Sequence, residues 1–265
     1  MKTTAIHQTQ SNTFPRVVIT SVVILALLAS FALMQGCRGN RPYSDTTPPE
    51  HFTYLPDTTG IPMELHFTRG RYHNHPLMAF WIEDTAGNYL RTLYVAVSIG
   101  KGEFRYGSAE EGFWKPGEIQ RPSALPYWGH RRGVENEYGN MIPSPKHPMP
   151  DAMTGPTPKR NFIIHTNTGT PLPQQFVVKM EINQTWDFNE YWTNNKFPGN
   201  EEYMTSCQPA LVYKAVVDLE SKQKEYQMEA IGHSHYDGSD GSLTTDLSTI
   251  TTALDIAREV KVVFP

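Results

Sequence analysis

Short β-type segments recur along this chain, and turns or loops separate them instead of helical patterns. Residues 63–68 alternate between apolar and polar side chains, and residues 77–82 and 89–97 flank a turn sequence at 85–88 that predicts a β-hairpin. The absence of strand–helix alternation predicts an all-β fold over residues 61–265, an antiparallel β-sandwich of the immunoglobulin or fibronectin kind. The remaining strands are expected at residues 161–165, 176–182, 210–217, 226–231 and 260–264.

A long proline-rich excursion interrupts these strands between residues 100 and 160. Residues 115–160 contain nine prolines, and the aromatic residues there follow no period. Because proline fixes φ and lacks an N–H donor, we expect the excursion to wrap the outside of the domain without adding central strands. One helix is predicted between Asp246 and Glu259, with one or two turns near residues 253–258, since apolar residues recur there at spacings of three and four.

The amino terminus has the composition of a secretory signal. Basic residues and no acidic residue precede an apolar run over residues 17–34, and Gly36 directly precedes Cys37. This order predicts a lipoprotein signal peptide at residues 1–36, with Cys37 as the lipidated first residue of the mature chain. The alternative is an uncleaved signal anchor, because the run is about as long as a minimal membrane-spanning helix. Both interpretations predict an extracytoplasmic protein, in the periplasm or at the cell surface, attached to the membrane.

Composition narrows the class of protein further. A hydrophobic content of 38% is enough for a real core, and the net charge of −4 argues against a nucleic-acid partner. Residues 37–60 are polar and contain several prolines, which predicts a flexible tether between the anchor and the domain. With Cys37 lipidated, Cys207 has no cysteine partner, so no intrachain disulfide is expected, and Cys207 is expected to be a buried small hydrophobe.

The most distinctive motif lies at the end of the excursion and reads Asp151-Ala-Met-Thr-Gly-Pro-Thr-Pro158. Its Asp-x-x-Thr-Gly-x-Thr pattern resembles the site at which bacterial flavin transferases attach FMN to a threonine. The resemblance implies Thr157 as the acceptor of a covalent FMN, with Asp151, Thr154 and Gly155 as recognition residues. Pro156 replaces the usual alanine, and proline, glycine, threonine and aspartate also suit a tight turn with no cofactor role.

The basic residues Arg131, Arg132, Lys159 and Arg160 bracket the excursion. A phosphate-bearing ligand such as FMN would suit this local positive charge, and so would an ordinary solvated surface.

Several phrases along the domain together resemble one family. They are Met78 to Asp84, Tyr89 to Tyr94, Asp151 to Lys159, Glu181 to Glu190, Gln208 to Tyr213 and Gly232 to His235. The family comprises bacterial periplasmic proteins with a domain of unknown function, whose genes tend to lie beside flavin transferases and extracytoplasmic redox proteins. The resemblance covers most of residues 61–265 and implies a component of a flavin-linked redox system, with a flavin transferase or a redox protein as partner.

Histidine pairs suggest a metal site as another hypothesis. His233 and His235 are two residues apart on a predicted strand and would share a face, so Asp237 or Asp240 could complete a site with them. The neighbouring glycines favour a strand end, where the histidines would hydrogen-bond to adjacent strands. His73 and His75 have the same spacing and would add to the site if the two pairs met in space.

The segment from Glu181 to Trp192 leaves a strand and enters a polar, aromatic loop. Glu181 could form an acid–base pair with Asp187 or Glu190, but no spacing rule fixes their separation. Trp186 and the other aromatic residues could instead serve a protein or glycan partner, because aromatic side chains favour interfaces. The sequence contains no nucleophile elbow, phosphate-binding loop or dinucleotide fingerprint, so catalytic residues are not predicted and a non-enzymatic binding or assembly module is the main alternative to a redox component.

Overall fold

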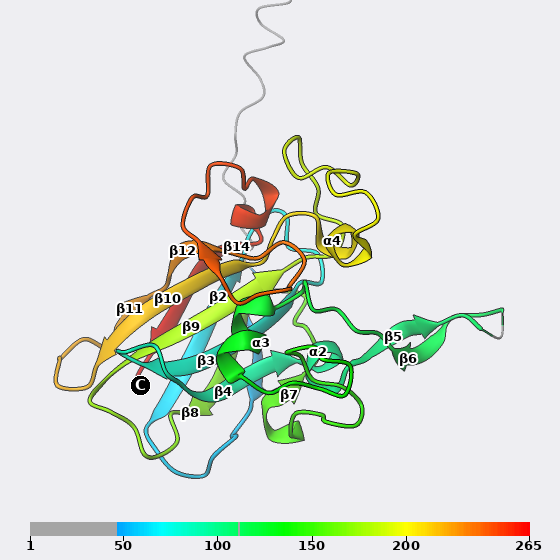
Figure 1. The fold of residues 1–265 in the computed structure, drawn as a ribbon. Helices are drawn as coiled ribbons and strands as arrows, with labels where there is room; N and C mark the ends of the chain where they lie inside the picture. The colour runs from blue at the N-terminus through cyan, green and yellow to red at the C-terminus, as the bar shows by residue number, and fades with distance from the viewer. Residues whose placement is uncertain (1–46, 111) are drawn as a thin grey trace, which may run out of the picture. The chain divides into compact units, whose positions relative to one another are not determined.

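The computed structural model describes residues 47–110 and 112–265, which form a mostly β structure of two larger sheets and one small sheet (Figure 1). The predicted signal peptide, the predicted lipidation site Cys37 and the first part of the predicted tether lie outside the described residues. Among the described residues, no helix is long and apolar enough to cross a membrane.

The larger sheet has seven strands in the order β13-β12-β10-β9-β3-β4-β7. The predicted hairpin is confirmed, since β3 and β4 pair in antiparallel fashion and the Asp84 carboxylate accepts the backbone N–H groups of Ala86 and Asn88 in the turn. The strands of this sheet are β3 (Leu77–Asp84), β4 (Tyr89–Ala96), β7 (Thr154–Gly155), β9 (Gln175–Asn183), β10 (Leu211–Asp218), β12 (Glu229–Ser234) and β13 (Leu243–Thr244).

The second sheet has five strands in the order β1-β8-β2-β14-β11. Its first strand lies inside the range that we predicted as a flexible tether, and there the prediction does not hold, because residues 50–53 pair with β8. The strands are β1 (Glu50–Thr53), β2 (Pro62–Arg69), β8 (Phe162–Asn167), β11 (Glu225–Gln227) and β14 (Ala257–Val263).

One apolar core draws side chains from both of these sheets. Alternate residues of several strands enter it, for example Met63, Leu65 and Phe67 of β2, while the residues between them face away. This period-two alternation is what a strand with one buried face requires. Cys207 is also buried in this core, as predicted.

Most strand pairs are antiparallel, but two pairs at the sheet edges are not. β1 runs parallel to β8, and β7 runs parallel to β4. A strand that joins a sheet after a long connection is free to take either direction, whereas a strand that follows a tight turn must reverse. The expectation of a wholly antiparallel arrangement is therefore wrong at these two edges.

The proline-rich excursion behaves as predicted and adds no central strand. It contains the separate two-stranded sheet of β5 (Glu103–Ser108) and β6 (Lys115–Glu118), and its β7 lies at the end of the seven-stranded order. Helix α3 (Pro126–Arg132) packs Leu125 and Trp128 into a second apolar cluster, together with Trp81 of β3. The other short elements are α2 (Val97–Lys101), η1 (Asp151–Met153), α4 (Glu201–Ser206) and η2 (Thr252–Asp255).

The helix predicted between Asp246 and Glu259 is largely wrong. Only the 3-10 turn η2 forms there, and β14 begins at Ala257. Asp246 does not cap η2, and its carboxylate instead accepts the backbone N–H of Ser248. Of the residues whose spacing suggested a helix, Ile250 and Ala257 are buried in the core, whereas Leu254 is 39% exposed, so the spacing does not mark one buried helix face.

Candidate functional site: an aromatic pocket with a polar rim

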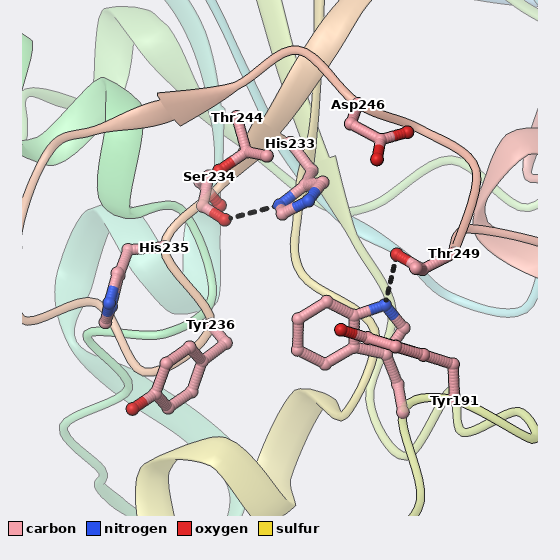
Figure 2. A pocket seen from close by; sticks show the side chains of 9 residues that line it. Tyr191, His233, Ser234, His235, Tyr236, Thr244, Asp246 and Thr249 are labelled. Carbon is pink, nitrogen blue, oxygen red and sulfur yellow. Dashed lines mark hydrogen bonds between the residues drawn. The ribbon is translucent and has the colours of Figure 1, made fainter.

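A pocket of about 240 Å³ opens where the loop after β9 meets the end of β12 and the segment after β13 (Figure 2). In Figure 2 the rings of Tyr191 and Tyr236 flank one side of the pocket, and His233 and Asp246 flank the other. The full lining is Tyr191, Trp192, His233, Ser234, His235, Tyr236, Thr244, Asp246 and Thr249.

Asn189 fixes the aromatic loop to the opposite wall of the pocket. Its side-chain Nδ2 donates to the carbonyl oxygen of Thr249 at 2.9 Å and to Thr251 Oγ1 at 2.9 Å. Its Oδ1 accepts the backbone N–H groups of Tyr191 and Trp192 at 2.9 and 2.7 Å. The Asn189 amide thus links both walls of the pocket and fixes the backbone of Tyr191 and Trp192. Such preorganisation lowers the cost of ordering a site when it binds a ligand.

Trp192 forms the floor on which the pocket is built. Its side chain is buried in the main core, and its Nε1 donates to Thr249 Oγ1 at 3.1 Å, which satisfies the indole donor. His233 meets it edge to face, with ring centroids 5.8 Å apart. Tyr236 extends the aromatic surface and stacks on Phe197 at 4.1 Å between centroids.

Three aromatic side chains of the loop, including Tyr191 of the pocket lining, are more than half exposed to solvent. Trp186 is 72% exposed, Phe188 is 61% exposed and Tyr191 is 52% exposed, although large aromatic residues usually bury most of their surface. Lys196 Nζ lies 3.3 Å from the centre of the Tyr191 ring, a cation–π contact that supports this ring from outside the core. The loop therefore presents aromatic surface to solvent next to the pocket.

The predicted metal residues lie in this region but do not converge. His235 Nδ1 pairs with Asp237 Oδ1 at 2.7 Å, whereas His233 Nδ1 contacts the carbonyl oxygen of Ser234. His235 follows the end of β12, so the strand alternation that would place both rings on one face does not apply to it. Among the described residues, no group of three or more His, Cys, Asp or Glu side chains is arranged to hold a metal ion.

The acid–base pair considered for Glu181 does not form. Glu181 is fully buried beneath α3, where its carboxylate accepts the backbone N–H groups of Tyr127 and Trp128 at 3.1 and 2.7 Å. Asp187 instead accepts the Thr252 hydroxyl near the main core. Burial raises the pKa of Glu181 to about 8. Its two hydrogen bonds give this carboxyl group a structural role, because they satisfy the first backbone N–H groups of α3.

The flavin-like motif lies at the edge of the seven-stranded sheet. Thr154 and Gly155 are buried in β7 beside β4, Thr157 is half-buried, and Asp151 is exposed with its carboxylate 2.6 Å from Lys101 Nζ. The Tyr94 hydroxyl lies 3.3 and 3.0 Å from the carbonyl oxygens of Gly155 and Pro156. Thr154 and Gly155 are thus held by backbone pairing with β4.

Two of the four cations that bracket the excursion, Arg131 and Arg132, make contacts within the domain. Arg131 Nη2 donates to the Tyr127 hydroxyl at 3.0 Å, and the Arg132 guanidinium lies 5.3 Å from the centre of the Trp128 ring.

Sequence reasoning found part of the pocket and missed the rest. It singled out the 186–192 aromatic loop and the two histidines, but it did not join them in one site. Tyr236, Thr244 and Thr249 were not predicted as site residues, since Tyr236 and Thr249 lie in irregular segments and Thr244 lies in the two-residue strand β13, which no sequence pattern marks. Comparison of the chain with protein-family models, curated proteins and solved structures finds no match.

Proposed function

We propose that this chain is a non-enzymatic, extracytoplasmic binding module whose aromatic pocket holds a sugar residue of a glycan. The two larger sheets, as a β-sandwich, serve as its rigid scaffold. The observation that carries the proposal is the combination of solvent-exposed rings with a pocket that has both apolar and hydrogen-bonding walls.

The chemistry of the pocket suits a sugar ring. A sugar has apolar C–H faces, which pack against aromatic rings, and hydroxyl groups around its edge, which donate and accept hydrogen bonds. Tyr191 and Tyr236 supply rings, while His233, Asp246 and Thr244 supply donors and acceptors. The pocket volume of about 240 Å³ suits one or two sugar units, with the exposed rings of Trp186 and Phe188 available for neighbouring units.

Binding is tested with the full chain and a panel of soluble hexasaccharides, cellohexaose, xylohexaose, chitohexaose and mannohexaose, by isothermal titration calorimetry. At least one should bind, and Tyr191→Ala should weaken that binding by about tenfold or more, because hot-spot aromatic residues contribute about 2 kcal/mol each. Trp114→Ala is the matched control, since Trp114 is 66% exposed but lies beside the separate β5–β6 sheet.

Two results would overturn the glycan assignment. The first is equal loss of binding in Trp114→Ala and Tyr191→Ala. The second is failure of every saccharide together with binding to a purified periplasmic protein that Trp186→Ala abolishes, which would reassign the surface to a protein partner.

The anchor is a separate part of the proposal. Lipidation of Cys37 would tether the module outside the cytoplasm, so Cys37→Ser should move the protein from the membrane fraction to the soluble fraction. Retention of Cys37→Ser in the membrane with an intact amino terminus would show the signal-anchor alternative.

The flavin hypothesis stays a prediction with its own measurement. Half-burial of Thr157 leaves part of its side chain accessible, while the pairing of Thr154 and Gly155 in β7 limits the motion that a transferase would need. Intact mass after co-expression with an active flavin transferase decides it. A gain of one FMN that Thr157→Ala abolishes would establish a carrier in a flavin-linked redox system.

A further inference from the structure

A strained backbone presents the Trp186 side chain at the surface. This side chain is 72% exposed, and its φ of 57° lies in the left-handed region, which residues other than glycine rarely adopt. Cys207, in the segment paired with it, also has a positive φ, of 67°. Such conformations persist only where the surrounding contacts impose them, and they are concentrated at active sites and ligand clamps. The exposed indole ring is therefore a candidate ligand-binding group.

Backbone hydrogen bonds to the end of α4 impose this conformation. The Trp186 N–H donates to the carbonyl oxygen of Thr205 at 3.1 Å, and the Asp187 N–H donates to that of Ser206 at 3.0 Å. The Gln208 N–H in turn donates to the carbonyl oxygen of Asp187 at 2.9 Å. Together these bonds fix the direction in which the Trp186 side chain leaves the backbone.

A buried arginine of the proline-rich excursion supports the same turn. Arg121 is only 6% exposed, and its Nη1 donates to Thr185 Oγ1 at 2.8 Å while its Nη2 donates to the carbonyl oxygen of Thr205 at 2.9 Å. Arg121 thus contacts both the residue before Trp186 and the acceptor of the Trp186 N–H. A guanidinium group can make both contacts at once, because its donors form a rigid planar fork.

Trp186 lies outside the lining of the aromatic pocket, and helix α4 connects the two places. Tyr203 of α4 meets the ring of the pocket residue Tyr236 edge to face, with centroids 5.9 Å apart, whereas Thr205 in the last turn of α4 holds Trp186. A ligand confined to the pocket therefore leaves the Trp186 ring uncovered, and a longer ligand that leaves the pocket along α4 can reach it.

We propose that Trp186 forms an outer subsite, with Arg121 as its positioning residue, which makes the module selective for long glycan chains over the short saccharides that fill the pocket. This inference rests on the proposed function. The face of the indole ring suits the apolar C–H side of a sugar ring, as the pocket rings do. Because the turn is already fixed, the outer subsite adds affinity with little further cost of ordering.

The test compares the biose with the hexaose of the cellulose, xylan, chitin and mannan series by isothermal titration calorimetry on the purified full chain. In at least one series the hexaose should bind about tenfold or more tightly than the biose. Trp186→Ala should remove most of this ratio and leave biose binding unchanged, while Trp186→Phe, which keeps an aromatic face, should retain most of it. Trp114→Ala is the matched control and should keep the full ratio, since Trp114 is 66% exposed beside the separate β5–β6 sheet.

Arg121→Gln tests the positioning role. It should lower the hexaose-to-biose ratio by about threefold or more, because the turn must then be ordered when the ligand binds. Thr185→Val removes only the hydroxyl group that Arg121 contacts, on an exposed residue, so it should lower the ratio in the same direction while the fold is kept. Biose affinity depends on the pocket alone and should stay unchanged in both variants, and thermal melts check their fold.

The outcomes separate this inference from the proposed function. A chain that binds biose and hexaose equally well would overturn the outer subsite and leave the glycan pocket intact. An equal loss of biose and hexaose binding in Trp186→Ala would also overturn it, since Trp186 would then act on the pocket. An unchanged ratio in both Arg121→Gln and Thr185→Val would overturn the positioning role, and failure of every saccharide would overturn the proposed function together with this inference.

Discussion

The outer faces of the two larger sheets both carry charged and polar side chains, which are buried on the seven-stranded sheet and partly exposed on the five-stranded sheet. On the seven-stranded sheet, Glu83, Lys179 and Glu181 lie under α3 and, together with Tyr127 of that helix, form what we call the covered cluster. On the five-stranded sheet, Glu64 contacts His66 and His165, and His165 contacts His51 of β1. These four residues, which we call the open cluster, remain partly exposed, with the His165 side chain at 39%. Both clusters occupy outward positions of paired strands. They differ in burial because α3 covers only the first of them.

The covered cluster satisfies its charges internally. Lys179 Nζ lies 2.7 Å from Glu83 Oε2 and donates to the Tyr127 hydroxyl at 2.7 Å, while Trp81 Nε1 donates to Glu83 Oε1 at 2.8 Å. Buried charges that lose their water need such partners, and the loss of one partner costs more than the pair contributes. Exposed pairs keep their water and contribute little. We therefore expect the stability of the fold to depend on the covered cluster much more than on the partly exposed pairs of the open cluster.

The largest expected effect is Lys179→Met, which removes the closest cation from the buried Glu83 carboxylate and leaves only Arg131 Nε at 3.9 Å. Unfolding in urea should show a loss of about 3–5 kcal/mol. The double variant Glu83→Leu with Lys179→Met should recover much of that loss, because it removes both charges. A loss under about 1 kcal/mol in the single variant would contradict the burial of the pair.

The next effect is a dependence of stability on pH that Glu181 creates. Its folded-state pKa of about 8 lies above the ordinary value of 4.5, so the folded protein holds a proton that the unfolded chain has lost. This contribution is therefore complete below about pH 4.5 and declines by a few kcal/mol as the pH rises to about 8. Urea titrations across this range should show the slope, and Glu181→Gln should flatten it. An unchanged slope in Glu181→Gln would exclude this carboxyl as the source.

A smaller effect is expected when one hydroxyl of the covered cluster is removed. Tyr127→Phe keeps the ring under the helix but takes away the oxygen that accepts hydrogen bonds from Lys179 and Arg131. We expect a loss of about 1–3 kcal/mol, since a buried donor is left without a partner. Tyr138→Phe is the control, because Tyr138 is 54% exposed and should change stability little.

The smallest effect is expected in the open cluster. Glu64→Gln should lower the free energy of unfolding by less than about 1 kcal/mol, because its partners are partly exposed histidines. The same urea assay measures it. A loss as large as that of Lys179→Met would show that the two faces do not differ in the way described.

Much of the strand pattern could be predicted from the sequence. These features depend only on residues close together in the chain. The alternation of Met63, Leu65 and Phe67 indicated a strand, and the turn at residues 85–88 indicated a hairpin. The prolines of the excursion indicated an outer segment. The helix after Asp246 failed because a short apolar spacing fits more than one local structure, and contacts with the core decided it.

The sequence by itself determined which residues alternate across each strand, because that period is a local property of extended backbone. It could not determine which outward residues are covered. Glu181 and Glu64 occupy equivalent outward positions, and only the arrival of α3, more than 40 residues before Glu181 in the chain, buries the first and leaves the second open. The pocket has the same origin, since Trp192, Tyr236 and Thr249 meet only through long-range packing.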